Sequence, residues 1–474
     1  MRLRRGFVPC RKGRLKLDTM VEIISKMLAN NKFSAIKEML SEMNIVDIAA
    51  LIEEMEPENQ VRLFRLLPKT SSADAFSYLP SDIQSNIVDA ITNSELEFLM
   101  EDMFLDDAVD FLEEVPANVV TRVLAHTKPD TRKLINKFLQ YPENSAGSIM
   151  TIEMVSFPET YTVKQAIEMI RKTALDKETI YTCYCMDEKR KLVGTVPLRK
   201  LIVAPEDQIV KDIMEDDEQL IFVNTMDDQE EVAAIAKKYD LLSIPVVDKE
   251  ERLVGIITID DIVDVIEDEN TEDFEKMALL LPSEDSYLKT GIFTLYKNRI
   301  VWLLILMVSA TFTGQIIEGF EDKLSMIAGL TASIPMLMDT GGNCGNQVST
   351  LVIRGLALGD IHIKDFFKII WKEIRVAVLC GLTLAVVNYA RMWIIKLVTH
   401  NDISSNTFIV VCLAMICAVI VAKVIGCALP ILAKLLHLDP ALMAGPMITT
   451  IVDALTLLIY FGFATLFING GLLV

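Results

Sequence analysis

Long apolar runs dominate the C-terminal part of this chain. Each approaches the roughly 20 residues that a helix needs to cross a bilayer core of about 30 Å. The five runs cover residues 301–317, 324–338, 376–397, 408–432 and 442–468. Lys and Arg gather before the first run, between the second and third, and between the fourth and fifth. By the positive-inside rule, this pattern predicts a transmembrane domain of five helices over residues 291–474, with the preceding residues in the cytoplasm and the C-terminus outside.

The apolar positions of residues 20–140 recur at helical spacing in short segments that prolines interrupt. The junctions Leu67-Pro68 and Leu79-Pro80 repeat one pattern, a leucine-rich helix followed by a polar helix start. We therefore expect an N-terminal α-superhelical domain of stacked short helices. Residues 1–19 form a basic segment without the apolar core of a signal peptide. We expect this segment, including residues 11–16, to be a disordered start that touches anionic lipid.

An alternating β and α pattern begins after Tyr141 and contains an internal repeat. Residues 190–202 recur as residues 251–263, at an offset of 61. In each copy a β-rich run is followed by a helix, two strands and a second helix. The pattern predicts two copies of one α/β domain, over residues 141–205 and 206–262. An acidic connecting helix within residues 263–290 then leads to the apolar runs.

Charge is distributed unevenly between these regions. Residues 18–290 hold 56 Asp and Glu against 27 Lys and Arg, a net charge of −29, whereas residues 291–474 hold 10 against 12. This excess of acid argues against nucleic acid as a partner. Such a surface either serves solubility or attracts cations that bind it. The eight cysteines are scattered, which suits a reducing cytoplasm, and Cys183 with Cys185 makes only a weak candidate for a metal pair.

Asp453 is the one residue inside the last apolar run that is charged at neutral pH. A carboxylate at that depth costs several kcal/mol unless it faces a polar cavity, a partner or an ion. Gly445, Thr449 and Asp453 recur at a spacing of four, which places them along one helix face. Pro446 lacks a donor and should free the carbonyl of Leu442. Two interpretations follow: the wall of a cation pathway, which we favour, or an acid that joins two helices.

A second unusual string runs through residues 335–347 and contains Gly341-Gly342-Asn343-Cys344-Gly345. Glycines and amides at membrane depth mark backbone that is either irregular or closely packed, and that is not exposed to lipid. Uncharged amide oxygens suit a cation that keeps its water shell, as Mg²⁺ does. No P-loop, nucleophile elbow or metal triad occurs, so an enzyme has little support.

Together these features resemble the MgtE family of magnesium channels and transporters over nearly the whole chain, with the repeat resembling a tandem pair of CBS domains. The closest strings are residues 141–150, 341–347, 439–441 and 445–453. The resemblance implies a homodimer in the plasma membrane whose two fifth spans enclose the pore. It implies a pathway whose candidate residues are Asp453, Asn343, Thr449, Gly445 and Asp439.

The same resemblance implies a cytoplasmic Mg²⁺ sensor in the helical domain, the CBS pair and the connecting helix. Its candidate acids are Asp106, Asp110, Glu230, Asp240, Asp261, Asp264, Glu269, Glu272 and Asp273. In the second CBS copy, Gly255, Thr258 and Asp261 resemble an adenosine-nucleotide motif, in which Thr and Asp hold ribose and Gly lets phosphate approach. The first copy lacks the Thr and the Asp, so one regulatory ATP site is expected at most.

The expected function is uptake of Mg²⁺ down its electrochemical gradient, gated by internal Mg²⁺. One alternative keeps transport and changes the ion to Co²⁺, Ni²⁺ or Zn²⁺. These metals prefer His and Cys ligands, of which the pore strings offer only Cys344. Another alternative is a membrane-anchored CBS sensor that conducts nothing, for which Asp453 would be dispensable.

Overall fold

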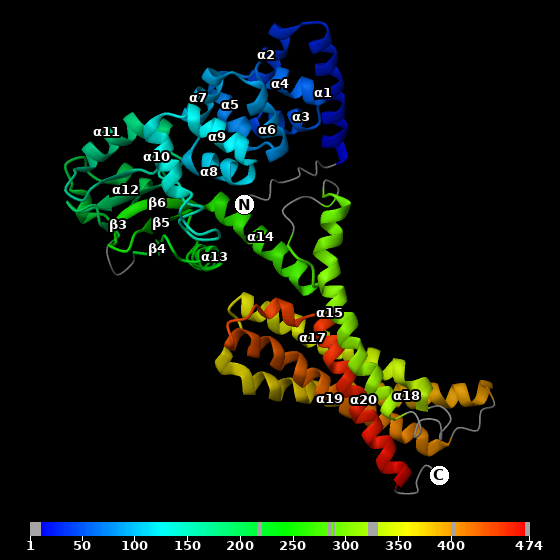
Figure 1. Cartoon of the computed structure of the whole chain (residues 1–474). Helices are drawn as coiled ribbons and strands as arrows, with labels where there is room; N and C mark the ends of the chain where they lie inside the picture. Colours follow the sequence, from blue (N-terminus) through cyan, green and yellow to red (C-terminus); the bar gives the residue numbers. More distant parts are fainter. Residues whose placement is uncertain are drawn as a thin grey trace. The chain divides into compact units, whose positions relative to one another are not determined.

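The computed structural model describes residues 11–215, 220–282, 287, 290–320, 330–399 and 404–469. The chain divides into two compact units, Met1–Glu269 and Asn270–Val474. The boundary falls inside one helix, α14 (Ile259–Met277). Figure 1 shows the helical and mixed α/β parts of the first unit and the long helices of the second.

Ten helices form the N-terminal part of the first unit. They are α1 (Arg11–Ala29), α2 (Phe33–Ser41), α3 (Ile45–Glu53), α4 (Pro57–Phe64), α5 (Lys69–Ser77), α6 (Ser81–Ala90), α7 (Asn93–Asp102), α8 (Leu105–Glu114), α9 (Ala117–His126) and α10 (Pro129–Phe138). The predicted helical domain is confirmed. The expected disorder of residues 11–16 is wrong, because α1 already begins at Arg11. Residues 1–10 lie outside the described residues.

The prolines that interrupt the apolar pattern mark helix starts. Pro68, Pro80 and Pro116 immediately precede α5, α6 and α9, and Pro57 and Pro129 are the first residues of α4 and α10. Proline fits there because the first helical N–H groups have no acceptor within the helix, and its fixed φ is already helical. The repeated Leu-Pro junction therefore predicts the helix boundaries correctly.

Most of these helices pack on the helix two places along the chain. Such pairs are α3 with α5, α4 with α6, α5 with α7, and α7 with α9. Three rings join successive layers: Phe76 lies 5.9 Å from Phe64 and 5.1 Å from Phe111, between ring centroids. The buried amide of Gln84 donates to the Phe76 carbonyl at 2.7 Å. The apolar stripe of each short helix is thus buried only by stacking.

The two CBS copies each contain a three-stranded sheet with helices. The first copy has β1 (Ser156–Pro158), α11 (Val163–Thr173), η1 (Ala174–Asp176), β2 (Thr182–Met186), β3 (Leu192–Pro197), α12 (Leu198–Val203) and η2 (Val210–Asp212). The second has β4 (Val223–Asn224), α13 (Gln229–Lys238), β5 (Ser243–Val247), β6 (Leu253–Thr258) and α14. In each, the first strand is parallel to the middle strand and the third is antiparallel to it.

Equivalent positions of the two copies meet. The backbones of Lys191 and Arg252, which are counterparts in the repeat, form an isolated antiparallel β-bridge. The Leu192 N–H donates to the Glu251 carbonyl at 3.1 Å. The hydroxyls of Tyr184 and Ser243 lie 2.8 Å apart, and the Tyr184 side chain is fully buried. The repeat therefore forms one pseudo-symmetric module.

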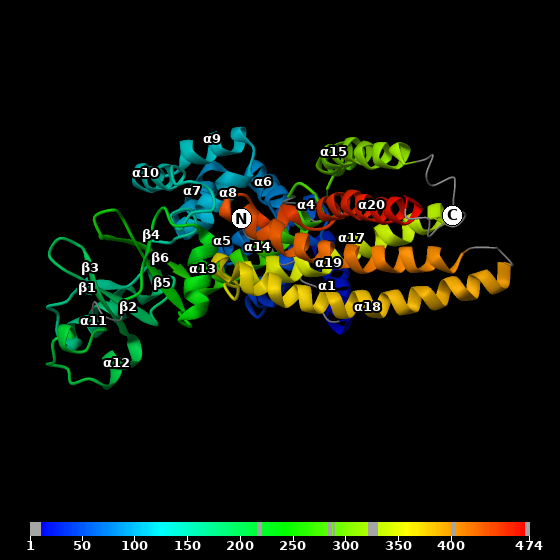
Figure 2. The same ribbon diagram turned by 90° about the horizontal axis from the view of Figure 1, so that it is seen from below.

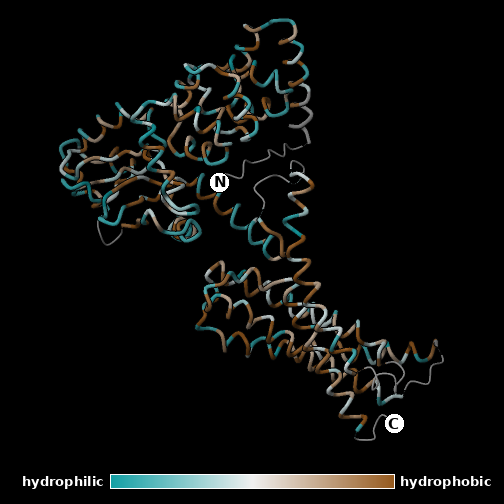
Figure 3. Tube along the Cα trace, in the orientation of Figure 1, coloured by the Kyte–Doolittle hydropathy of each residue, from teal (hydrophilic) through white to brown (hydrophobic). Residues whose placement is uncertain are grey.

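Five long helices form most of the described part of the second unit. They are α15 (Ile292–Gly319), α17 (Leu330–Ala357), α18 (Phe366–Thr399), α19 (Ser405–Leu435) and α20 (Pro446–Asn469), with the short helices η3 (Ile363–Asp365) and η4 (Pro440–Met443). Figure 2 shows α17, α18, α19 and α20 running side by side, and Figure 3 shows their apolar character.

By length and composition, three helical segments of the described residues can cross a membrane: Ile292–Gly319, Ser405–Leu435 and Pro440–Asn469. The count of five spans stays a prediction. The predicted start of the second run at residue 324, and the last five residues of the chain, lie outside the described residues.

The glycine-and-amide string lies within a continuous helix. α17 runs for 28 residues through Pro335 and past Gly345, so the irregular-backbone interpretation is wrong and close packing is the correct one. A Cβ on Gly341 would lie 2.6 Å from Thr456 Oγ1, and one on Gly345 would lie 2.9 Å from Ile448. A Cβ on Gly426 of α19 would overlap the Gly345 carbonyl. Small residues thus let three helices approach closely.

Pro446 also differs from the expectation. It is the first residue of α20, and Leu442 belongs to the preceding η4. Proline therefore frees no carbonyl within a helix. Instead it begins the helix that carries Thr449 and Asp453.

We predict that Gly426→Ala destabilises the second unit by about 1–3 kcal/mol, because the added methyl group overpacks the contact with α17. The matched control is Gly462→Ala on α20, where a Cβ meets nothing within 4 Å. Thermal unfolding of purified protein in detergent measures both. Equal melting temperatures for the two variants would contradict the proposed packing.

Candidate ion pathway and cytoplasmic sites

The Asp453 carboxylate lies against the glycine surface of α17. A Cβ on Gly342 would be 3.6 Å from Asp453 Oδ1 and 2.7 Å from Thr449 Cγ2. Because Gly342 has no side chain, Thr449 and Asp453 fit against α17 one helical turn apart. The close packing of the string therefore determines where the carboxylate lies.

Asp453 is half-buried, and its Oδ1 is fully buried. No donor among the described residues reaches this oxygen. A role in joining helices within the chain would need such a donor. An acid that contacts an ion or its water does not, so the geometry favours the pathway interpretation.

Two faces of α17 differ in character. One face, which includes the glycines, is buried. Asn343 lies on the other face, in a row of exposed polar side chains that we call the α17 polar stripe. The stripe comprises Asp339, Asn343, Gln347, Thr350 and Arg354. In a bilayer these groups have to face water or protein rather than lipid.

Gly445 has a backbone role. Its φ is +50°, a left-handed conformation that glycine adopts without strain. A Cβ there would lie 2.6 Å from the Met277 carbonyl. Its N–H donates to Asn346 Oδ1 at 2.9 Å, and its carbonyl accepts from Thr449 Oγ1 at 2.9 Å. Gly445 thus links α17 with the start of α20.

Asp439 anchors the turn before α20. It caps η4 by accepting from the Ala441 N–H at 2.8 Å, and it pairs with Lys276 at 2.7 Å. Lys276 also pairs with Glu272 at 2.7 Å. Burial lowers the pKa of Lys276, but hydrogen bonds with Asp439 and Glu272 outweigh it and raise the pKa overall. A charged Lys276 therefore ties the end of α14 to the segment that begins α20.

The predicted sensor acids occupy three helical regions. Asp106 is buried in the first turn of α8, with Asp110 one turn later. Burial, then the neighbouring Asp110 carboxylate, raises the pKa of Glu113 on the same helix. Glu230 lies in the first turn of α13, and Asp240 follows the end of that helix. The acids on or near α14 are Asp261, Asp264, Glu269, Glu272 and Asp273.

Within the described residues, no three His, Cys, Asp or Glu side chains gather to hold a metal ion. Glu269 instead accepts from the Gln229 amide at 2.8 Å. The nine predicted sensor acids therefore form no three-ligand site among the described residues. Their roles stay predictions.

Two side chains of the nucleotide motif are hydrogen-bonded to each other rather than free to bind a ligand. Thr258 Oγ1 donates to Asp261 Oδ2 at 2.7 Å, and both residues are buried. Gly255 has a packing role: a Cβ there would lie 2.6 Å from the Thr151 carbonyl. A Cβ on Gly194 in the first copy would likewise lie 2.7 Å from the Glu215 carbonyl. Close backbone contact therefore explains this glycine in both copies without any phosphate.

Cys183 and Cys185 lie side by side in the core of the first CBS copy. Both are fully buried, and burial raises the pKa of each thiol to about 12. Among the described residues, no group of three His, Cys, Asp or Glu that could hold a metal ion includes them. The weak metal-pair interpretation loses its support.

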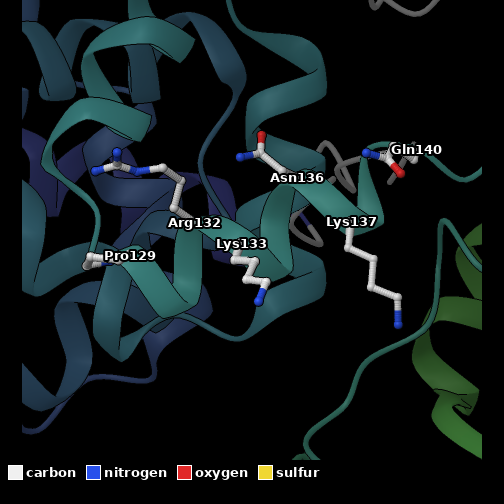
Figure 4. A pocket seen from close by; sticks show the side chains of 6 residues that line it. All are labelled: Pro129, Arg132, Lys133, Asn136, Lys137 and Gln140. Atoms are coloured by element: carbon white, nitrogen blue, oxygen red, sulfur yellow. The ribbon is translucent and has the colours of Figure 1, made fainter.

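A pocket that the sequence did not indicate lies along α10, on its basic face (Figure 4). It is lined by Pro129, Arg132, Lys133, Asn136, Lys137 and Gln140. It has no acidic lining residue and is unsuited to a cation. The acid that sequence reasoning did miss is Asp339, whose spacing of four from Asn343 could have revealed it.

Three family descriptions match the chain in order. "MgtE intracellular N domain" matches residues 43–144, "CBS domain" matches 146–207 and 210–268, and "Divalent cation transporter" matches 334–463. The chain is 35% identical to a magnesium transporter MgtE of Thermus thermophilus, over 94% of this chain and 98% of the relative. It is 31% identical to one of Bacillus subtilis, over 96% and 98%.

Solved structures match the cytosolic part. The soluble part of a magnesium transporter is 30% identical, with a TM-score of 0.50, and covers 53% of this chain and 99% of its own. The cytosolic domain of the Mg²⁺ channel MgtE in complex with ATP is 37% identical, with a TM-score of 0.48, over 51% and 98%. The identity over nearly the full length of the curated relatives shows that this chain belongs to the MgtE family of magnesium transporters.

Proposed function

We propose that this chain conducts Mg²⁺ into the cell down its electrochemical gradient. The observation that carries the proposal is the buried Asp453 Oδ1, which lies against the glycines of α17 without a donor among the described residues. An inside-negative potential contributes about 2.3 kcal/mol per charge per 100 mV, so a divalent ion needs no other driving force.

Oxygen chemistry favours Mg²⁺ over the softer divalent ions. Asp453, Thr449 and the α17 polar stripe offer carboxylate, hydroxyl and amide oxygens, which suit a hydrated Mg²⁺. Cys344 is buried on the packed face of α17 and does not belong to the stripe. The thiol that would favour Zn²⁺ or Co²⁺ is therefore directed away from the proposed pathway.

A homodimer explains how the exposed polar stripe is kept from lipid. In the proposed assembly, α20 and the α17 polar stripe of each copy face the partner across a water-filled path. Asp453 from both copies then contacts the same hydrated ion. This arrangement agrees with the family resemblance and gives the stripe an aqueous environment.

Gating is proposed to use the cytoplasmic acids and the Lys276 contact. Like charges that are crowded at domain faces repel, and bound Mg²⁺ bridges them and favours the compact state. Glu113 beside Asp110 is an example of such crowding. Because Lys276 joins the end of α14 to Asp439, a shift of α14 is transmitted to the start of α20. The connecting helix thus acts on the inner end of the pathway.

ATP is proposed as a regulatory ligand of the second CBS copy alone. Thr258 and Asp261 are replaced by Pro197 and Lys200 at the same offset in the first copy. Lys200 there pairs with Glu215 at 3.1 Å. In the second copy, ribose hydroxyls would replace the internal bond between Thr258 and Asp261.

We predict that Asp453→Ala abolishes Mg²⁺ uptake, because a methyl group cannot hold a water-coordinated cation. Asp453→Asn keeps the shape and should lose most of the divalent preference. Uptake into proteoliposomes with an imposed inside-negative potential measures both, with equal protein incorporation as the control. If both variants take up Mg²⁺ at the wild-type rate, the pathway interpretation is contradicted and Asp453 is better explained as an acid that joins two helices.

We predict that Mg²⁺ protects α14 of the wild type from protease, and that Asp106→Ala with Asp110→Ala shifts this protection to higher Mg²⁺. Weak oxygen sites place the wild-type transition at about 0.1–1 mM or above. The control, Asp82→Ala with Glu97→Ala, removes two exposed acids of α6 and α7. It should leave the Mg²⁺ concentration needed for protection unchanged. If K⁺ at matched ionic strength protects equally well, salt is only screening the repulsion between the carboxylates, and the proposed bridging of these carboxylates by Mg²⁺ is contradicted.

We predict that ATP binds the full chain once per protomer and that Thr258→Ala weakens binding at least tenfold, or about 1.4 kcal/mol. Thr195→Ala in β3 of the first copy is the matched control and should bind as the wild type does. Isothermal titration calorimetry gives both values. Binding that is insensitive to Thr258→Ala would overturn this assignment.

A further inference from the structure

Asp339 is the second acid on the two helices, α17 and α20, that form the proposed pathway. It lies on α17 one turn before Asn343 and is exposed on the α17 polar stripe. It lies one helical turn before Gly342, where a Cβ would be 3.6 Å from Asp453 Oδ1, so the two carboxylates lie near each other and repel. Two helices thus bring one acid each to the same level of the proposed pathway.

Within the part of the chain that the structure describes, neither acid is compensated by a cation. Among the described residues, no ion pair involves Asp339 or Asp453, whereas Glu373 of α18 pairs with the buried Lys423 of α19 at 3.7 Å. The bundle thus pairs a partly buried acid with a buried cation where the two residues join neighbouring helices. Two repelling acids without a counter-charge are costly at that depth unless a mobile cation compensates them.

We propose that Asp339 is a second cation-contacting carboxylate of the pathway and sets its affinity and its preference for divalent ions. This inference rests on the proposed function and adds a residue that determines specificity. A hydrated divalent ion between Asp339 and Asp453 is attracted by two charges, and a monovalent ion gains only half as much from each. Asn343, one turn along the stripe, offers its amide to the same water shell.

The position of Asp339 suits a site that accumulates ions without trapping them. Its side chain is exposed in the single chain, so it contacts an ion through water rather than by dehydrating it. Asp453 has a buried oxygen and is held against Gly342. Asp339 should therefore control how readily Mg²⁺ enters the site, and Asp453 should be required for passage.

The test measures initial Mg²⁺ uptake by proteoliposomes against external Mg²⁺, for wild type and Asp339→Asn. We expect Asp339→Asn to raise the half-saturating Mg²⁺ roughly tenfold, because one of two charges is lost, and to leave the maximal rate within about threefold. Competition by external K⁺ should become stronger. A structural defect would lower the maximal rate without changing ion preference.

Three further variants locate the effect. Asp339→Glu keeps the charge and should restore affinity. Asp339→Asn with Asn343→Asp moves the carboxylate one turn along the stripe and should recover most of the divalent preference. The control Asp360→Asn removes an exposed acid from the turn after α17 and should behave as the wild type does. If Asp339→Asn is not recovered as folded protein, Asp339→Gln replaces it in the same comparison.

Unchanged half-saturation and K⁺ competition in Asp339→Asn would overturn the inference, and so would an equal effect of Asp360→Asn. Either result leaves the proposed function intact if the wild type conducts and Asp453→Ala does not. Absence of uptake by the wild type itself would instead refute the proposed function, together with the inference that rests on it.

Discussion

A carboxylate at membrane depth has to be compensated, and the described architecture of the second unit is consistent with that requirement at Asp453. The glycines at 341, 342 and 345 let α20 approach α17 so closely that Asp453 Oδ1 is withdrawn from solvent. No donor of the described chain satisfies it. The adjoining exposed face of α17 carries polar groups that lipid cannot solvate. A water-filled ion path between two copies would provide a partner for Asp453 and would also solvate the polar face of α17.

The cytoplasmic end of the bundle shows how such a path could respond to the cytoplasm. Lys276 lies between Glu272 and Asp439 and holds the end of α14 against the turn that begins α20. Gly445 completes this contact, because only a residue without a Cβ fits beside the Met277 carbonyl. Its N–H bond to Asn346 continues the connection into α17. A chain of short polar contacts thus joins the connecting helix to both helices of the proposed pathway.

Features with a local cause could be predicted from the sequence. Pro68 and Pro80 mark helix starts because proline acts on its own turn, and the repeat at residues 190–202 and 251–263 revealed the paired module. Features that depend on distant partners could not. From the sequence alone, the string at 341–347 is equally compatible with an irregular and with a closely packed backbone, and the contact with α20 decides between them. The motif around Gly255 likewise does not predict that its backbone packs against Thr151. Apart from its spacing from Asn343, Asp339 has no signal of its own in the sequence, because its place near Asp453 depends on how α17 and α20 pack.

The central claim is that one protein both conducts Mg²⁺ and closes when internal Mg²⁺ binds its cytoplasmic acids. The most direct measurement is Mg²⁺ uptake by wild-type proteoliposomes under a fixed inside-negative potential, with internal free Mg²⁺ clamped at low or high values. The account predicts rapid uptake at low internal Mg²⁺ and a steep decline as it rises through the range on the order of 1 mM, where weak oxygen sites fill. Uptake that is absent at low internal Mg²⁺, or that continues unchanged at high internal Mg²⁺ once the smaller gradient is allowed for, would contradict it.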